Sequence, residues 1–346
     1  MCGPRRAGGP DAGPCRGTGG REPLAAGFTG PYAGHRSQEP AGEPAARRPE
    51  RAARDRETAG GRDKEVAAVE LPLLVGVDGS GPGLLAVDWA ADAAVRHSAP
   101  LCLVHGVEDR GEDGPEPEEL MSAAAERVRL RAPGVRVTTV VLDEEPGTAL
   151  VHAGRNAFAL VVGSRGRGGI AGLLLGSVGL EAAGRADCPV VVVRGGETAR
   201  TGGHGRIVLG VGDRVDGSPA AHFAFREAAA RHCRLHAVRT WRRPAHTAEN
   251  HLLLQGSPAG ARRREAMDHL DGALRAAARE YSGIDLHLHA VEGSTRAVLL
   301  EESRRADLLV IGAHRRQGRL GLQLGVVDHT VIHHADCPVA LVPEHI

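Results

Sequence analysis

The chain has 346 residues, 43 basic and 43 acidic side chains, 42% hydrophobic residues and only 2% aromatic residues. Balanced charge and few rings for base stacking exclude a basic nucleic-acid-binding surface, so no nucleic-acid partner is expected. No apolar run approaches the roughly 18 residues of a membrane span, and no apolar segment follows the first arginines as a secretory signal requires. These features predict a cytoplasmic protein with no membrane partner and with room for two ordinary domains.

Gly, Pro, Ala and Arg dominate residues 1–68, with Asp and Glu interleaved and almost no periodic apolar pattern. Such a segment buries too little apolar surface to offset the entropy lost on ordering. The interleaved acids favour a solvated tail over a basic interaction arm. We therefore predict a disordered tail over 1–68, followed by folded domains over 69–198 and 199–346.

The first predicted strand, Leu73 to Asp78, is a short apolar run that ends in an acid. After a glycine-rich turn, alanines, Trp89 and Val95 recur at helical spacing from Leu84 to His97. Further strands are predicted at Leu101–His105, Val135–Leu142, Leu160–Val162 and Pro189–Arg194. Helices are predicted between them: one ends near Arg131, one spans Thr148–Asn156, and one precedes the last strand. Strands that alternate with helices predict parallel β–α–β crossovers.

The second part of the folded region repeats the first. Ile207–Val211 matches the first strand at an offset of 134 residues, and from the fourth strand onward the offset is 149, as Gly163 and Gly312 show. The extra residues lie around His246 to Arg263, and the glycine-rich segment Gly195–Gly205 joins the copies. A fixed offset of this kind predicts two copies of one α/β domain.

The stretch Gly163–Val178 follows an apolar strand and has the features of an anion site. Gly163 and Gly166 permit a sharp turn and the close approach of a ligand to bare amides. Ser177 is expected at the start of the next helix, where the first N–H groups have no partner within the helix. No acid occurs from Ala159 to Leu180, whereas two arginines lie inside the loop, so the local charge also favours phosphate.

Several catalytic motifs are excluded by residue identity. A phosphate-binding Gly-Lys-Ser/Thr loop is excluded because the only lysine is Lys64, in the predicted tail. The dinucleotide-binding GxGxxG pattern does not follow the first strand, and the GxSxG nucleophile elbow is incomplete at Ser80 and at Ser177. No catalytic residue is therefore assigned.

Two histidine pairs have spacings that suit a metal ion. His329 and His333 lie one helical turn apart, and His287 and His289 lie on one face of a predicted strand. The sequence shows no third ligand, and the first copy lacks both pairs. Solvated faces are the favoured interpretation, and no metal site is assigned.

Asp78 at the end of the first strand either points into a ligand cleft or caps the following turn. Together with the spacing Gly163-x2-Gly166-x9-Gly176-Ser177, it resembles the nucleotide-binding pattern of the universal stress protein family. The duplicated layout resembles the tandem, actinobacterial-type members, and the likeness covers nearly all of residues 70–344. It implies an α/β fold of two flavodoxin-like (Rossmann-like) parallel sheets, each of five strands in the order 3-2-1-4-5.

The resemblance also implies an adenine-nucleotide site for ATP in the first domain. Mg²⁺ would accompany the ATP, although no dedicated carboxylate ligand can be named. The implied contacts are Val77, Asp78 and Gly106 beside the base, Val162 and Gly163 beside the ribose, and Arg165, Gly166, Gly176, Ser177 and Val178 beside the phosphates.

The second copy departs from this pattern. Arg315 replaces the second glycine and Val326 replaces the serine, so a side chain blocks close approach and a hydroxyl donor is lost. Gly212 takes the place of the acid unless Asp213 or Asp216 substitutes for it. We predict that this half binds ATP weakly or not at all and serves packing or partner recognition, although the arginines of its loop could still attract an anion.

Three functions remain open. The favoured one is a nucleotide-responsive regulator of the stress response, which binds ATP with little or no turnover and contacts an unknown protein partner. The alternatives are an interaction protein of the same fold, whose glycines serve only tight packing, and a slow ATPase.

The final strands of the two halves, Pro189–Arg194 and Pro338–Val342, are predicted to be edge strands, and exposed sheet edges tend to pair with another strand or to be covered. We therefore expect the two halves to pack as a pseudo-twofold pair, and a homodimer of chains is also possible.

Overall fold

A computed structural model of the chain describes residues 71–107, 116–166, 175–213, 217–242, 258–314, 316–318 and 321–344. All of them lie in one compact unit, Val66–Ile346. The tail predicted over residues 1–68 lies outside the described ranges. Within those ranges, no helix is both long enough and apolar enough to cross a membrane.

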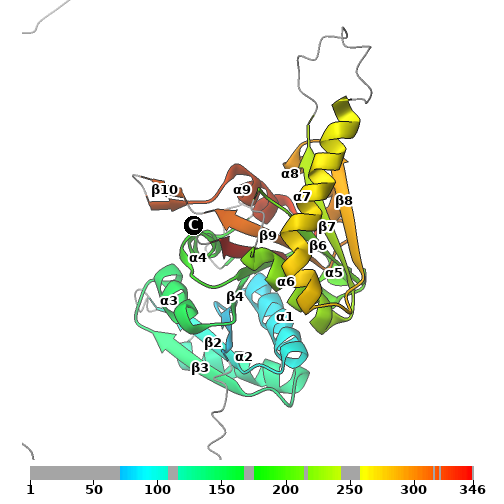
Figure 1. The fold of residues 1–346 in the computed structure, drawn as a ribbon. Helices are drawn as coiled ribbons and strands as arrows, with labels where there is room; N and C mark the ends of the chain where they lie inside the picture. Colours follow the sequence, from blue (N-terminus) through cyan, green and yellow to red (C-terminus); the bar gives the residue numbers. More distant parts are fainter. Residues whose placement is uncertain are drawn as a thin grey trace, which may run out of the picture. The chain divides into compact units, whose positions relative to one another are not determined.

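Ten strands form one continuous sheet (Figure 1). They are β1 Leu73–Gly76, β2 Leu101–Gly106, β3 Val137–Leu142, β4 Ala159–Gly163, β5 Val190–Val193, β6 Arg206–Gly210, β7 Arg234–Trp241, β8 Leu286–Glu292, β9 Leu308–His314 and β12 Val339–Glu344. Their spatial order is β3-β2-β1-β4-β5-β12-β9-β6-β7-β8, and neighbours within each half are parallel. Each half therefore has the predicted order 3-2-1-4-5, which confirms the fold class, and the two sheets join edge to edge.

The halves meet where β5 and β12 pair in antiparallel register. Val191 lies opposite Ala340, which is its own equivalent at the 149-residue offset, and the pairs on either side exchange in the same way. This symmetric register makes a local pseudo-twofold axis, and it covers both predicted edges. Because the pairing is antiparallel, the carboxyl ends of the strands face opposite edges of the sheet in the two halves.

Helices cover both faces of the sheet. They are α1 Gly81–His97, α2 Pro117–Arg131, α3 Pro146–Ala153, α4 Ser177–Arg185, α5 Glu197–Thr201, α6 Pro219–Arg231, α7 Pro258–Glu280, α8 Thr295–Ser303 and α9 Val326–His334. One apolar core joins α1 and α2 with α6 and α7, and the opposite core joins α3, α4 and α5 with α8 and α9. Alternate residues of β5 and β12 enter opposite cores, so both cores run across the junction.

The start of α1 is set by its capping chemistry. The hydroxyl oxygen of Ser80 accepts the Gly83 N–H at 3.1 Å, Pro82 lies in the first turn, and Ser98 ends the helix with a φ of 52°. These are the preferred features of an N-terminal cap and a left-handed C-terminal cap. They place the first turn of α1 directly after β1, at the carboxyl edge of the sheet.

Three segments differ from the expectation from sequence. The joining segment contains the short helix α5, and Gly195 before it has a φ of +79° and packs against the Asp336 carbonyl. The second half has a longer crossover helix, since α7 has 23 residues against 15 in α2. The chain after β9 forms an antiparallel hairpin of β10 (Arg316–Gly318) and β11 (Gly321–Gln323) instead of an open glycine loop.

Candidate functional site

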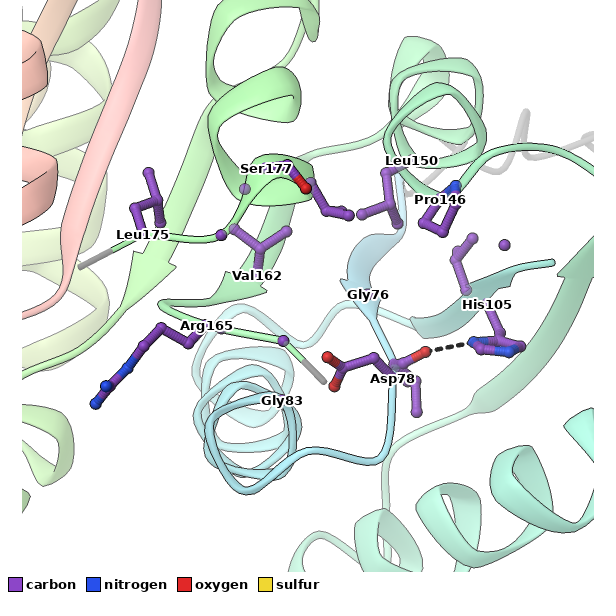
Figure 2. Close-up of a pocket in the computed structure, with 18 residues that line it drawn as sticks. Gly76, Asp78, Gly83, His105, Pro146, Leu150, Val162, Arg165, Leu175 and Ser177 are labelled. Atoms are coloured by element: carbon purple, nitrogen blue, oxygen red, sulfur yellow. Dashed lines mark hydrogen bonds between the residues drawn. The ribbon is translucent and has the colours of Figure 1, made fainter. Parts of the chain in front are cut away.

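A cavity of about 420 Å³ opens at the carboxyl ends of β1, β2 and β4 (Figure 2). The crevice between β1 and β4 is where the strand order reverses, the place at which doubly wound sheets bind ligands. The cavity is lined by all ten residues that the resemblance implied: Val77, Asp78, Gly106, Val162, Gly163, Arg165, Gly166, Gly176, Ser177 and Val178. Segments about 100 residues apart in sequence thus meet around one space.

The N-terminus of α4 faces this cavity. The helix begins at Ser177, as predicted, and its N-cap is Gly176, so no side chain of the described residues caps the first turn. The Gly176 N–H donates to the Ser164 carbonyl oxygen at 3.0 Å, which holds the end of the loop beside β4. The first N–H groups of α4 can therefore meet a ligand, and the helix dipole favours an anion there.

Two glycines of the cavity are required by packing. A Cβ on Gly163 would lie 2.7 Å from the Pro82 carbonyl oxygen and 2.9 Å from the Gly83 nitrogen. One on Gly106 would lie 2.6 Å from Pro146 Cα. Because backbone atoms at these distances leave no space for a side chain, both positions need glycine whether or not a ligand binds.

The other two glycines of the motif have different surroundings. A Cβ on Gly166 would lie 2.7 Å from a carboxylate oxygen of Asp78, so this glycine lets the loop lie against the acid. A Cβ on Gly176 would have no neighbour nearer than 3.5 Å. The bare backbone at Gly176 is therefore not explained by packing, and it borders the cavity.

Asp78 both lines the cavity and stabilises the turn after β1. Its Oδ1 accepts the Ser80 N–H at 3.0 Å and the Ser80 hydroxyl at 2.8 Å. The Ser80 hydroxyl lies 3.3 Å from the Arg165 carbonyl oxygen, which links this turn to the glycine loop. The two interpretations that the sequence left open for this acid are therefore compatible.

The opposite end of the cavity is mostly apolar. Pro146 and Leu150 of α3 line it beside the predicted residues, whereas Leu175, directly before the N-cap of α4, lines the end near Ser177. His105 also lines it, and its Nδ1 donates to the Val77 carbonyl oxygen at 2.6 Å (Figure 2). Sequence reasoning missed these residues because α3 carries no motif, although His105 directly precedes the predicted Gly106.

The side chain of Arg165 extends away from Asp78 and from the middle of the cavity in Figure 2. The part of this residue that faces its neighbours is the backbone, whose carbonyl contacts Ser80. In this conformation the guanidinium group of Arg165 does not point into the cavity.

In the second half, α9 begins with Val326, whose surface is 69% exposed, and Asp328 accepts the N–H of the N-cap residue Gly325 at 3.0 Å. Asp328 thus satisfies the N–H of the N-cap residue of α9, whereas the equivalent N–H in the first half, that of Gly176, donates to the Ser164 carbonyl oxygen. Asp213 does not replace Asp78, since its side chain is 99% exposed and pairs with Arg239 at 2.9 Å. The predicted residues Arg315 and Asp216 lie outside the described residues.

The histidines form stacks. His287 and His289 face His236 on the neighbouring strand, with ring centroids 4.7 and 5.0 Å from it, and His329 lies 5.4 Å from His333. Burial, together with the positive charge of Arg206 and the neighbouring imidazoles, lowers the pKa of His236 to about 4. In the described part of the chain, no group of three or more His, Cys, Asp or Glu side chains is arranged to hold a metal ion.

Most of the chain is similar in sequence to known proteins of one family. The model of the universal stress protein family matches residues 72–194 and 203–343. A universal stress protein of Mycolicibacterium smegmatis is 30% identical over 302 residues, which cover 80% of this chain and 98% of that protein. A universal stress protein of Mycobacterium tuberculosis is 41% identical over 135 residues, or 36% of this chain and 46% of that protein.

Solved structures show the same fold. A universal stress protein from Archaeoglobus fulgidus superposes with a TM-score of 0.57 at 16% identity, covering 80% of this chain and all of that chain. A shorter universal stress protein solved in complex with cAMP is 29% identical over 36% of this chain, with a TM-score of 0.31. The similarity to the Archaeoglobus fulgidus structure with a TM-score of 0.57 extends over both halves.

Proposed function

The chain belongs to the universal stress protein family, and from this premise we propose that its first half binds ATP and that occupancy changes its contacts with a protein partner. The observation that carries the proposal is the N-terminus of α4, which faces the 420 Å³ cavity without a side-chain cap. A triphosphate would accept hydrogen bonds from the amides of this turn and from the Ser177 hydroxyl.

The other end of the cavity suits a purine. Its apolar walls include Val104 and Leu150, and its volume is within the range of small-molecule sites. Val77 and Gly106 also line the cavity and would lie beside the base. The ribose would then lie near Val162 and Gly163, between the apolar end and α4.

Mg²⁺ would neutralise charge on the phosphates. Among the described lining residues, Asp78 is the only acid, and its Oδ1 already accepts two hydrogen bonds from Ser80. We infer that Mg²⁺, when present, is held mainly by the nucleotide and water.

An interaction protein that binds no nucleotide is the second candidate. It is favoured by the packing of Gly163 and Gly106, which explains two glycines without any ligand. It does not explain Gly176, which no close neighbour constrains, or the uncapped first turn of α4. These two features are the reason to prefer the nucleotide-binding function.

Calorimetric titration of the full chain with ATP tests the choice. Gly166→Arg, which reproduces the residue of the second copy, places a side chain against Asp78 and is expected to abolish measurable binding. Gly134→Arg is the matched control, because a Cβ there meets no atom within 4 Å. Negligible heat for the unsubstituted chain, or equal binding by all three proteins, would contradict the proposal.

Slow hydrolysis of ATP is a separate question. No catalytic base is assigned in the cavity, so we expect no steady phosphate release at high protein concentration. Steady release that disappears in Asp78→Ala would instead identify a slow ATPase. ATP binding without phosphate release supports a regulatory role.

A further inference from the structure

Two arginine side chains lie over the indole ring of Trp89, at the place where α1 meets α6. The guanidinium carbons of Arg96 and Arg231 lie 5.8 and 5.2 Å from the centre of this ring. Trp89 is 3% exposed, and the side chain of Arg231 is 6% exposed. None of the three is among the described residues that line the first cavity, so the proposed function does not account for them.

Four N–H groups of this cluster are buried and have no hydrogen-bond partner. They belong to Trp89 Nε1, Arg96 Nε, Arg96 Nη2 and Arg231 Nη2. Indole and guanidinium nitrogens only donate, so these groups cannot satisfy one another. Because buried donors in folded proteins nearly always meet an acceptor, four of them around one ring indicate that an acceptor binds here.

The two acids whose charges reach this cluster are bonded elsewhere. The carboxylate oxygens of Glu227 contact His97 at 2.7 Å and the Nε of Arg231 at 3.0 Å. Those of Asp92 accept two hydrogen bonds from Arg131, at 2.7 and 2.8 Å. Neither acid supplies the acceptor that the four donors lack.

Arg96 is a largely buried cation that forms no ion pair with any residue in the described ranges. Burial and the charge of Arg231 lower its pKa to about 10, against the opposite effect of Glu227 and Asp92. The guanidinium group is therefore still protonated at neutral pH. Glu227 also acts on the charge of Arg226, a third, partly buried arginine. Positive charge thus exceeds negative charge where α1 meets α6.

We propose that Trp89, Arg96 and Arg231 together bind one small inorganic anion of the size of chloride. The anion accepts the N–H groups of the three side chains and offsets the charge of Arg96. A small ion is favoured over an organic phosphate, because the four donor atoms have almost no solvent-exposed surface. Since the site needs α1 and α6 side by side, the anion binds the folded chain and stabilises the contact between the halves.

Thermal unfolding of the full chain at neutral pH tests the proposal. Sodium chloride replaces sodium gluconate at constant ionic strength, and gluconate is too large for the buried donors. We expect the unfolding midpoint to rise with the chloride concentration and to reach a plateau, because an ion that binds only the folded state stabilises it by mass action. A midpoint that does not depend on chloride, as a water molecule at the donors predicts, would overturn the proposal.

Two substitutions locate the site. Arg96→Gln removes the cation that has no ion pair, and it should weaken the affinity for chloride, obtained from the midpoints, at least about tenfold. In gluconate its midpoint should stay close to that of the unsubstituted chain. Arg129→Gln is the matched control, since the Arg129 side chain is 60% exposed, and it should change the affinity less than about twofold. Equal chloride dependence in the two variants would contradict the proposed site.

A third variant separates a bound ion from general screening of charge by salt. Arg96→Lys keeps the positive charge but lacks the Nε and Nη2 donors. A bound anion predicts weaker chloride dependence than in the unsubstituted chain, whereas screening predicts no change and would overturn the proposal. Crystals of the full chain soaked in sodium bromide should show an anomalous peak beside Arg96 and Arg231. A bromide-soaked crystal without a peak there would also overturn it.

Discussion

At the scale of single residues, the glycines around the first cavity have separable roles. Gly163 and Gly106 permit contact between backbone segments, whereas Gly176 leaves a helix N-terminus open. The family resemblance implies a ligand contact at each of these three positions. The structure distinguishes them. A Cβ added at Gly163 or Gly106 would clash with packed backbone atoms, whereas a Cβ added at Gly176 would have no neighbour nearer than 3.5 Å.

Gly163→Ala should destabilise the fold even without nucleotide. Its Cβ would approach the Pro82 carbonyl oxygen to 2.7 Å, and overpacking of this kind typically lowers the free energy of unfolding by about 1–3 kcal/mol. Urea unfolding of the nucleotide-free chain measures the change. Gly134→Ala, at an open position, should stay within about 0.5 kcal/mol, and equal stabilities of the two variants would contradict the packing role.

At the scale of elements, α1 and α6 meet around a buried acid. Glu227 is 1% exposed and contacts His97 of α1 at 2.7 Å and Arg231 of its own helix at 3.0 Å. Burial by itself would raise the pKa of Glu227, but the charge of Arg231 and the hydrogen bond from His97 outweigh it and lower the pKa to about 2. The ionised acid thus neutralises the guanidinium group of Arg231, which is buried beside it.

Glu227→Gln leaves the buried Arg231 without its carboxylate partner, so we expect the free energy of unfolding at neutral pH to fall by about 3–5 kcal/mol. The folded pKa lies below the ordinary value of 4.5. The stabilisation is therefore complete above about pH 4.5 and is lost as the pH falls toward 2. Denaturant unfolding from pH 7 to pH 2.5 should show the difference between the two proteins shrinking over this interval. A difference that does not change with pH would exclude ionised Glu227 as its source.

At the scale of the whole molecule, the two halves share their apolar cores. Residues of β5 and β12 enter both cores, and each core contains helices from both halves. The boundary at residue 198 predicted from the sequence repeat therefore marks two copies of a fold rather than two separate cores. Shared cores couple the stability of the half that carries the first cavity to that of the other half.

We expect thermal unfolding of the described unit to be a single transition, because neither half can open β5–β12 without exposing both cores. Val191→Ala, at the centre of the junction, should lower the free energy of unfolding by about 1–3 kcal/mol and shift the whole transition. Calorimetry of the full chain measures both effects. Two resolved transitions, or a shift of only one of them, would contradict the shared-core interpretation.

Much of the fold and of the candidate site was predictable from local patterns. Apolar runs such as Leu160–Val162 identified the buried strands, and the constant offset identified the repeat. The resemblance that Asp78 and the motif from Gly163 to Ser177 carry implied ten of the residues that line the first cavity. His105, Pro146 and Leu150 were missed, because they reach the cavity through the crossing of β2 and α3 rather than through a motif.

The sequence by itself determined the repeat, the start of α4 at Ser177 and the loss of the serine at Val326, because periodicity and residue identity are local properties. The order of strands in each half came from the resemblance to a known family. Only the tertiary structure decided that the two sheets form one, that Glu227 is buried between α1 and α6, and that Glu344 lies at the N-cap of α6. Each of these depends on residues more than 100 positions apart, whose proximity follows from strand pairing across the β5–β12 junction and from parallel crossovers, not from spacing along the chain.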